Sequence, residues 1–181
     1  MYSILRDLWK WRYPLFYNKK TKKKVPTVHD VNDFEKSISQ IKEYIKATNF
    51  EDRYNLKVHF HVDATQKRFS IQLEPLWTKK LIERYQPGTI FSDETFAVFS
   101  AGYSLSVVRI RTNGTSACVL MTITNFCDES FFKLNLGLVL DLIPSAVYLM
   151  ADCALAPRAF INEANRTNQF GRVLKYRAIV C

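Results

Sequence analysis

The sequence predicts an α+β fold, with an antiparallel sheet of about six or seven strands and two main helices, preceded by a basic N-terminal arm. Three observations predict this fold. Apolar residues alternate with polar residues in several short segments, they recur at steps of three and four in one long segment, and positive charge gathers in the first 24 residues. The composition, with 48% hydrophobic and 14% aromatic residues but few glycines and prolines, is typical of a packed globular protein.

The length of 181 residues fits one domain with a sizeable core and an additional segment, since domains commonly run to about 100–200 residues. We assign residues 1–26 to a basic, aromatic-rich arm that Pro26 ends. Residues 27–181 form a single predicted α+β domain.

The arm opens with a short amphipathic segment and ends with a lysine cluster. Arg6, Asp7 and Lys10 fall on one helical face, and Pro14 limits a helix to about three turns. The apolar residues of the other face are Tyr2, Ile4, Leu5, Leu8 and Trp9. Such a segment is typical of a helix in a bilayer interface; the alternative is that it packs on the protein body or on a neighbouring subunit. Residues 19–24 hold five lysines, whose mutual repulsion prevents folding without a counter-charge.

The first main helix is predicted for residues 30–49. Asp30 has the character of a helix N-cap, with Asp33 three residues later. The apolar residues that recur at three- and four-residue steps are Val31, Phe34, Ile38, Ile41 and Ile45. The opposite face carries charges of both signs, which indicates a solvated surface.

Period-two alternation then predicts a first hairpin. Apolar and polar residues alternate from Leu56 to Asp63 and again, after a polar turn, from Phe69 to Glu74. This pattern is typical of an antiparallel pair with one buried and one solvated face. Residues 76–85 favour a short helix, closed by Gln86-Pro87-Gly88.

A second hairpin is predicted for two β-rich runs, residues 103–112 and 115–124. Asn113-Gly114 joins them, a pair typical of a type I′ turn with positive φ at both residues. The alternation slips near Val107 and Val108, which predicts a bulge there.

Leucine at every second position from Leu134 to Leu142 predicts a further strand that ends at Pro144. Residues 147–150 and 172–180 predict two more strands, with residues 157–168 as a short helix or loop between them. The apolar run over residues 134–151 contains polar residues and a proline, so we expect a core element and not a membrane span.

The cysteines are widely spaced and form no C-x-x-C pair; they are Cys118, Cys127, Cys153 and Cys181. This spacing predicts reduced intracellular thiols rather than a zinc cluster or a disulfide framework. Charged residues interrupt the apolar stretch from Ile4 to Trp11, so we expect no secretory signal.

No set of residues in the sequence supports catalysis, and we expect a protein that is not an enzyme and uses no cofactor. The five glycines stand apart, so there is no phosphate-binding loop, and no nucleophile or metalloprotease signature occurs. His59 and His61 share one strand face with Asp63 beyond them, a spacing that would suit a metal ion. The favoured interpretation is that they are ordinary residues on a solvated strand face, and a metal-dependent enzyme remains the third hypothesis.

Positive charge is concentrated at the N-terminus. Residues 1–24 contain eight basic residues against Asp7, a net charge of +7, whereas the other 157 residues carry a net charge of +2. This asymmetry predicts an anionic partner, either an acidic membrane surface or nucleic acid. The predicted contact residues are Arg6, Trp9, Lys10, Trp11, Arg12, Lys19, Lys20, Lys22, Lys23 and Lys24.

The two targets would use these residues differently. At a membrane, tryptophan and leucine enter the acyl boundary while each basic residue near the anionic headgroups contributes about 1 kcal/mol. On nucleic acid, lysines release counterions from phosphates and aromatic rings stack on unpaired bases. The helical phasing of residues 4–9 favours the membrane, because stacking does not require helical spacing. The lysine run suits either target and would also suit a nuclear-import signal.

The apolar-and-basic opening, the lysine cluster and one compact α+β domain of this size together resemble the organisation of rhabdovirus matrix proteins, especially the small ones of plant-infecting members. The resemblance covers the plan of the whole chain and rests on no diagnostic motif. It implies binding of acidic membranes, self-association and condensation of the nucleocapsid beneath the envelope. The residues to which it assigns membrane contact are Trp9, Trp11, Lys19, Lys20, Lys22, Lys23 and Lys24. Many animal-virus relatives carry a Pro-rich budding motif after the lysines, and Val25-Pro26-Thr27 is not one, which puts recruitment of host budding machinery in doubt.

We therefore expect a viral matrix-like structural protein that binds acidic membrane, forms homo-oligomers and condenses nucleocapsid. Its expected locations are the virion, the host cytoplasm and the inner face of membranes, with the nucleus as a further location. In the matrix-like protein the sheet domain associates with copies of itself or with a nucleoprotein. The alternative is a nucleic-acid-binding viral protein, such as a small capsid, movement or silencing-suppressor protein, that places the same lysines on phosphates.

Overall fold

The computed structural model describes residues 17–18, 23–24, 31–95, 103–151 and 155–178. The chain divides into two compact units, one comprising Met1–Tyr54 with Ala64–Lys67 and the other Asn55–Asp63 with Arg68–Cys181. We call them the helical unit and the sheet unit. The predicted boundary between arm and domain, at residues 26 and 27, lies outside the described residues.

The helical unit contains the predicted first helix. Helix α2 spans Val31–Ala47 and is followed by the short helix α3, Phe50–Tyr54. The chain turns between them at Asn49, which has a left-handed φ of 45°. Buried apolar residues lie on one side of α2, as the three- and four-residue steps predict; they are Phe34, Ile38 and Ile45.

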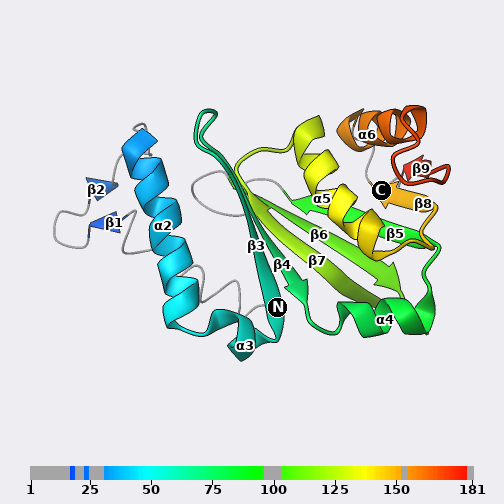
Figure 1. Ribbon diagram of the computed structural model, residues 1–181, viewed down its shortest axis with the longest axis horizontal. Coiled ribbons are helices and arrows are strands. Elements are labelled where there is room, and N and C mark those ends of the chain that lie inside the picture. The colour runs from blue at the N-terminus through cyan, green and yellow to red at the C-terminus, as the bar shows by residue number, and fades with distance from the viewer. Residues whose placement is uncertain (1–16, 19–22, 25–30, 96–102, 152–154, 179–181) are drawn as a thin grey trace. The chain divides into compact units, whose positions relative to one another are not determined.

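Two short strands also belong to the helical unit (Figure 1). Strand β1, Tyr17–Asn18, pairs antiparallel with β2, Lys23–Lys24. The predicted lysine cluster therefore ends in a short ladder of backbone hydrogen bonds.

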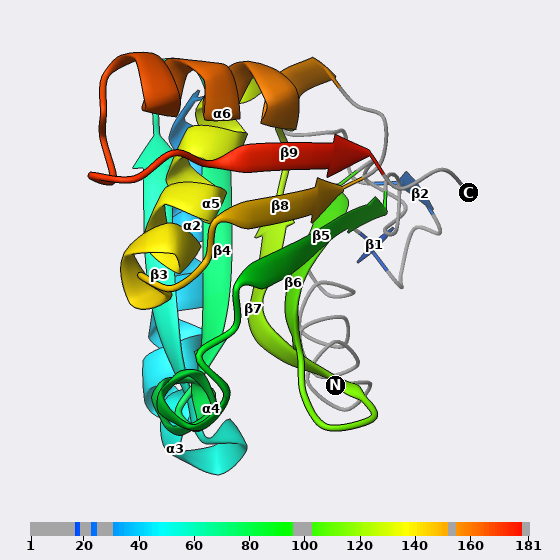
Figure 2. The ribbon, with the colours of Figure 1, turned by 90° about the vertical axis from the view of Figure 1, so that its right-hand side faces the viewer.

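The sheet unit is built on seven strands in the order β3-β4-β7-β6-β5-β8-β9. Their bounds are β3 Leu56–Asp63, β4 Arg68–Pro75, β5 Thr89–Thr95, β6 Ser104–Arg111, β7 Ser116–Thr124, β8 Tyr148–Ala151 and β9 Lys175–Ala178. The predicted α+β class is confirmed. The sheet is mixed, because β5 pairs parallel with β8 and β8 pairs parallel with β9, whereas the other neighbours are antiparallel (Figures 1 and 2).

Both predicted hairpins are present. Strands β3 and β4 pair from Leu56 with Pro75 to Asp63 with Arg68. In the hairpin of β6 and β7, Gly114 has a φ of 85° but Asn113 is not among the residues with positive φ, so the predicted type I′ turn is wrong. A type I′ turn requires positive φ at both central residues.

The same hairpin has a bulge beside Val108, as predicted, but its extra residue lies on the partner strand and not in the run where the alternation was expected to slip. The register shifts after Val108, which pairs with Leu120, because Arg109 pairs with Cys118. Val119 is therefore the additional residue, and it lies on β7. The extra residue lets both Val119 and Leu120 join the apolar core.

The strand predicted for Leu134–Leu142 is wrong: this segment belongs to helix α5, Glu129–Leu142. Its buried residues lie on one side, at the three- and four-residue steps of a helix; they are Phe131, Phe132, Asn135, Leu136, Gly137, Val139 and Leu140. Leu134, Leu138 and Leu142 are half-buried at the edges of this face, so a wide apolar stripe imitates a period of two. Leucine also favours helix over strand, which the alternation concealed.

Strand β5 and helix α3 were not predicted, whereas the remaining elements agree with the predicted order. Helix α4, Thr78–Tyr85, ends at Gln86, and helix α6, Leu155–Arg166, occupies the segment predicted as a short helix or loop. The predicted last two strands are β8 and β9. The described residues thus contain five helices rather than the two main ones predicted, and none of these helices is long and apolar enough to span a membrane.

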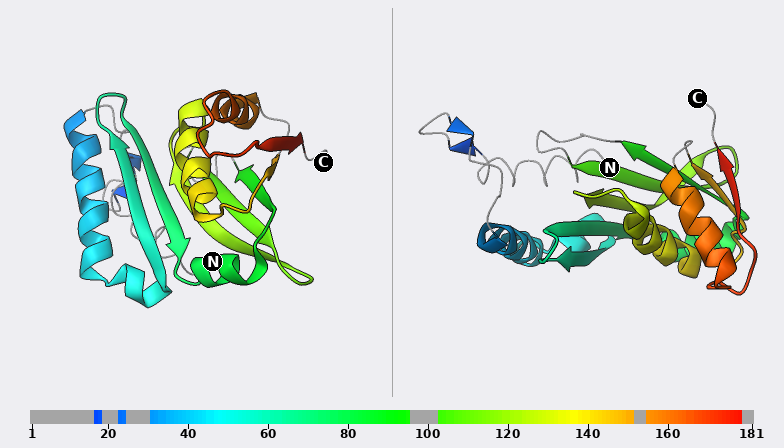
Figure 3. Two further views of the ribbon diagram at one scale, coloured as in Figure 1. Left: turned by 45° about the vertical axis from the view of Figure 1, so that its right-hand side comes forward. Right: turned by 90° about the horizontal axis from the view of Figure 1, so that it is seen from above.

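Helices α5 and α6 pack together and cover one face of the sheet, which we call the inner face (Figure 3). The opposite face is the outer face. Residues on the inner face of β5, β6, β7 and β8 join the helices in one apolar core; the strand residues are Ile90, Val108, Ile110, Leu120 and Leu149. Burial of such side chains stabilises the fold by about 25 cal/mol for each Å² of apolar surface removed from water.

A polar layer lies within this core, between α5 and the middle of the sheet. Asn135 is fully buried on α5 and its Oδ1 accepts hydrogen bonds from the Thr122 hydroxyl and, at 3.5 Å, from Gln72 Nε2. Its Nδ2 donates to Ser106 Oγ at 3.1 Å, and Ser106 Oγ donates to Glu94 Oε1 at 3.2 Å. These partners compensate the desolvation that burial imposes on polar groups.

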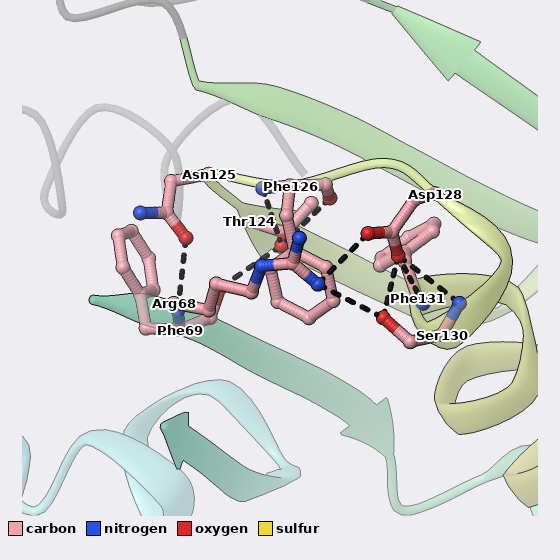
Figure 4. A network of polar contacts seen from close by, with 8 residues as sticks. All are labelled: Arg68, Phe69, Thr124, Asn125, Phe126, Asp128, Ser130 and Phe131. Carbon is pink, nitrogen blue, oxygen red and sulfur yellow. Dashed lines mark hydrogen bonds and ion pairs between the residues drawn. The ribbon is translucent and has the colours of Figure 1, made fainter. Parts of the chain in front are cut away.

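The start of α5 is fixed to the start of β4 by a second polar network (Figure 4). Asp128 is the helix N-cap, and its Oδ1 accepts from the backbone N–H of Ser130 at 3.0 Å and of Phe131 at 3.3 Å. Its Oδ2 lies 2.8 Å from Nη1 of Arg68, whose guanidinium also lies over the Phe126 ring. The carboxylate therefore caps the helix and joins it to the sheet.

The end of α5 is fixed to the segment that leads into β9. Arg172 donates to the carbonyl oxygen of Leu140 at 2.8 Å, of Ile143 at 3.2 Å and of Ala146 at 2.8 Å. A helix leaves its last carbonyl groups without intrahelical partners, and a guanidinium satisfies several of them at once. Asn165 on α6 adds hydrogen bonds to the backbone of Leu174, so the approach to β9 is held from two helices.

Candidate binding surface

Most of the predicted contact residues of the arm lie outside the described residues. These are Arg6, Trp9, Lys10, Trp11, Arg12, Lys19, Lys20 and Lys22. Lys23 and Lys24 form β2. Contact of the arm with membrane or nucleic acid therefore stays a prediction.

The structure gives His59 a partner other than a metal ion. His59 and His61 lie on one face of β3, as predicted, with the half-buried Asp63 at its end. The Nε2 atom of His59 is 3.0 Å from Oε2 of Glu74 on β4. Among the described residues, no group of three or more histidine, cysteine, aspartate or glutamate side chains could hold a metal ion.

The structure brings together a set of basic and aromatic residues that the sequence did not connect. On β8, Leu149 is buried in the inner core, so the alternating residues Tyr148 and Met150 face outward. On β9, Tyr176 packs against the same core, so Lys175 and Arg177 face outward. Residues paired across a sheet share one face, which extends this outer set from strand to strand.

Register places these residues in two rows across four neighbouring strands. In one row Arg109 of β6 pairs with Phe91 of β5, Phe91 with Met150 and Met150 with Arg177. In the other row Thr89 pairs with Tyr148 and Tyr148 with Lys175, and Arg111 stands two residues beyond Arg109 on β6. We call Phe91, Arg109, Arg111, Tyr148, Met150, Lys175 and Arg177 the outer-face patch.

Cations flank the aromatic middle of the outer-face patch. The Lys175 Nζ lies 5.5 Å and the Arg177 guanidinium carbon 4.8 Å from the centroid of the Tyr148 ring. Lys175, Arg177 and Arg111 are exposed, whereas Phe91, Tyr148 and Met150 are half-buried. The arrangement is an apolar, partly aromatic strip with positive charge on both sides.

Among the described residues, one acidic residue lies beside the patch. Asp93 on β5 is 4.0 Å from Nη2 of Arg109, and both side chains are well exposed, at 66% and 43%. An exposed ion pair at this limiting distance contributes little, on the order of 0–1 kcal/mol. Within the part of the chain that the structure describes, four cations thus stand against one carboxylate on this surface.

Sequence reasoning missed the patch because its parts come from segments that are distant in the chain. The parallel pairing of β5 with β8 and of β8 with β9 joins residues 89–91, 148–150 and 175–177, and alternation within one strand does not reveal such pairing. A usable signal was Lys175-Tyr176-Arg177, where two basic residues alternate with an aromatic residue in a predicted strand.

A second reason is that the net charge of a long segment does not show where its charges are concentrated. The net charge of +2 outside the arm conceals a further local excess, because residues 155–181 hold five basic residues and one acidic residue, Glu163. Two of those basic residues belong to the outer-face patch.

Comparisons of the chain with models of protein families, with curated proteins and with solved structures found no match.

Proposed function

We propose that this protein is a matrix-like structural protein of a virus, without enzymatic activity, that attaches to acidic membrane through its basic N-terminal arm. The observation that carries this proposal is the separation of charge: +7 in residues 1–24 against +2 in the remaining 157 residues. Each basic residue near an anionic membrane surface contributes about 1 kcal/mol, so five clustered lysines supply a strong electrostatic anchor.

The second half of the proposal concerns the sheet unit. A membrane-attached matrix layer requires a compact body that associates with copies of itself or with a nucleocapsid. The sheet unit has such a body, because one continuous core joins α5, α6 and the inner face of the sheet. The proposed locations are the virion, the host cytoplasm and the inner face of membranes.

Flotation with lipid vesicles tests the attachment. Full-length protein is mixed with vesicles of phosphatidylcholine alone or with phosphatidylserine added, and the bound fraction is measured at several salt concentrations. We expect binding to the acidic vesicles that weakens as salt rises. At 0.1 M salt, the attraction between exposed charges more than about 10 Å apart is largely screened.

A charge-matched pair of variants assigns the effect to the arm. The arm variant replaces Lys19, Lys20, Lys22, Lys23 and Lys24 by glutamine. The control variant replaces an equal number of exposed lysines elsewhere, Lys36, Lys46, Lys57, Lys79 and Lys80. We expect the arm variant to lose at least a hundredfold in affinity, since about 1 kcal/mol is lost for each lysine, and the control to lose far less.

Equal losses in the two variants would show that net charge, and not the arm, governs attachment. Retention of flotation by the arm variant, together with loss of binding to single-stranded RNA in a gel shift, would reject the membrane proposal and favour the nucleic-acid-binding alternative.

A further inference from the structure

We infer that the outer-face patch is a binding site for single-stranded nucleic acid, with phosphates on its cations and bases stacked on its aromatic strip. The site lies on the sheet unit and uses no residue of the arm. The inference therefore does not rest on the membrane attachment proposed above, and it adds a defined partner for the sheet.

The geometry of the patch suits an extended strand. Neighbouring strands of a sheet lie about 4.8 Å apart, so three spacings separate Arg109 on β6 from Arg177 on β9 by about 14 Å. Phe91 and Met150 lie between these two cations in the same row, and Tyr148 lies in the adjacent row. Cations thus border a strip that is two strands wide and presents ring surface.

The ligand must combine negative charge with flat apolar groups. Single-stranded nucleic acid does so, because its phosphates follow a positively charged path while each unpaired base offers a π-face to an aromatic side chain. A duplex hides those faces within its own stack. The patch therefore distinguishes single from double strands through Tyr148 and Phe91, and supplies charge through Arg109, Lys175 and Arg177.

The cations of the patch are available to such a ligand. For Lys175 and Arg177, the partner within the described chain is the Tyr148 ring and not a carboxylate. A contact between an exposed cation and a half-buried ring contributes on the order of 0.5–2 kcal/mol, which a contact with a phosphate can replace. Arg109 exchanges a distant exposed carboxylate, Asp93, for the phosphate at little cost.

The form of the patch favours nucleic acid over a bilayer. Segments that lie in a membrane interface insert large apolar side chains on one side and keep their cations on the other. Here Phe91, Tyr148 and Met150 are half-buried in the sheet surface between cations, so they offer a stacking surface rather than a wedge. Acidic vesicles are accordingly a control ligand in the test.

The test measures the affinity of full-length protein for a fluorescein-labelled oligouridine RNA by fluorescence anisotropy over a salt series. The patch variant carries Lys175→Gln and Arg177→Gln. The matched control carries Arg158→Gln and Arg166→Gln, which remove the same charge from exposed positions of α6. We expect the patch variant to bind at least tenfold more weakly and the control to stay within about twofold of the wild type, a difference of more than 1 kcal/mol by RT ln K.

The salt dependence separates phosphate contacts from a general effect of charge. Each phosphate contact to a single strand contributes about 0.7 to the slope of log affinity against log salt. Loss of two contacts should lower that slope by about 1.4 in the patch variant, with no change of this size in the control.

The aromatic part of the site is tested at Tyr148. We expect Tyr148→Ala to weaken binding by roughly five- to a hundredfold, and Tyr148→Phe, which keeps the ring, to restore most of the affinity. The thermal unfolding midpoint of every variant is measured, so that a loss of binding is ascribed to the site only in a folded protein.

Each outcome decides between ligands. The inference would be overturned if the patch variant and the Tyr148→Ala variant were both folded and bound RNA as tightly as the wild type. It would also be overturned if duplex RNA bound as tightly as single-stranded RNA and this binding depended on the patch. Reduced flotation on acidic vesicles with unchanged RNA affinity would assign the patch to the membrane and overturn the inference. If the patch variant floats with acidic vesicles as the wild type does but binds RNA more weakly, the inference is supported. This conclusion is independent of how the arm variant binds vesicles.

Discussion

Arg68 and Asp128 form an ion pair of 2.8 Å that joins the first residue of β4 to the N-cap of α5 (Figure 4). The two oxygens of the Asp128 carboxylate act on different elements, because Oδ1 accepts from the helix backbone while Oδ2 faces the guanidinium. One side chain therefore ends the loop after β7, starts the helix and attaches it to the sheet.

The two roles of Asp128 can be separated by mutation. Asp128→Ala removes both the cap and the ion pair, and we expect it to lower the free energy of unfolding by about 1–2 kcal/mol. Asp128→Asn keeps an N-cap acceptor and loses only the charge, and we expect a loss below about 1 kcal/mol because the pair is partly exposed. Urea unfolding of both variants measures the two values, and a larger loss for the asparagine variant would contradict this division.

The stability that Asp128 contributes should depend on pH. Partial burial raises the pKa of its carboxyl, but hydrogen bonds from Ser130 and Phe131 and the positive charge of Arg68 outweigh this and hold the pKa below its usual range. For a lowered pKa, the stabilisation is fully present above the unfolded-state value of about 3.9 and is lost as pH falls through the folded-state value. The difference in melting temperature between wild type and Asp128→Asn should be constant from pH 7 to pH 5 and narrow below about pH 4. A difference that persists at pH 2 would contradict an ionic origin.

Local sequence patterns predicted those helices and strands in which the buried positions match the apolar positions of the pattern. Helix α2 and strands β3, β4, β6 and β7 follow directly from periods of three to four and of two. Helix α5 did not, because it is packed against both the sheet and α6 and is apolar over most of its surface. Asp128, an N-cap residue followed by Glu129, was the available signal of a helix start, and leucine periodicity outweighed it.

The buried position of Asn135 predicts a large effect of its replacement. Asn135→Leu would remove the hydrogen-bond partner of the Thr122 hydroxyl and of the Gln72 amide, whereas Ser106 would keep its hydrogen bond to Glu94. An unsatisfied buried polar group costs about 1–3 kcal/mol, so we expect a loss of roughly 2–4 kcal/mol in the free energy of unfolding. Urea unfolding gives this value, with Asn162→Leu on the exposed face of α6 as the matched control, which should change stability by less than about 0.5 kcal/mol. A neutral Asn135→Leu would show that the polar layer does not stabilise the fold.

The candidate surface was less predictable than the fold for a topological reason. The predicted contact residues form one continuous segment, residues 6–24, and charge along the sequence is enough to find such a segment. The outer-face patch exists only after β8 and β9 add to the edge of β5 as parallel strands. Parallel pairing needs a long crossover, here α6 between β8 and β9, so the partners are not neighbours in sequence.

Arg172 should not be replaceable by lysine. Its guanidinium donates in three directions to carbonyl oxygens of Leu140, Ile143 and Ala146, whereas an ammonium keeps the charge but not the planar fork. We expect Arg172→Lys to lower the melting temperature by several degrees, consistent with a loss of about 1–3 kcal/mol. Arg166→Lys, at an exposed pair with Glu163, is the control and should have little effect. Equal melting temperatures for the two variants would mean that the C-terminal end of α5 does not need this cap.

Cys118 offers a probe of the sheet next to the outer-face patch, because it pairs with Arg109 in the ladder of β6 and β7. Burial raises the pKa of its thiol, against the smaller lowering effects of a hydrogen bond to the Leu120 carbonyl and of the Arg109 charge. Since the thiolate is the reactive form, a raised pKa and restricted access should both slow alkylation. We expect iodoacetamide at pH 8 to modify Cys118 at least tenfold more slowly in the folded protein than in the urea-unfolded chain, by peptide mass spectrometry. In the folded protein the rate should continue to rise with pH beyond the point where the unfolded chain levels off. A folded-state rate that levels off at lower pH than the unfolded one would show that the Arg109 charge outweighs burial at this position.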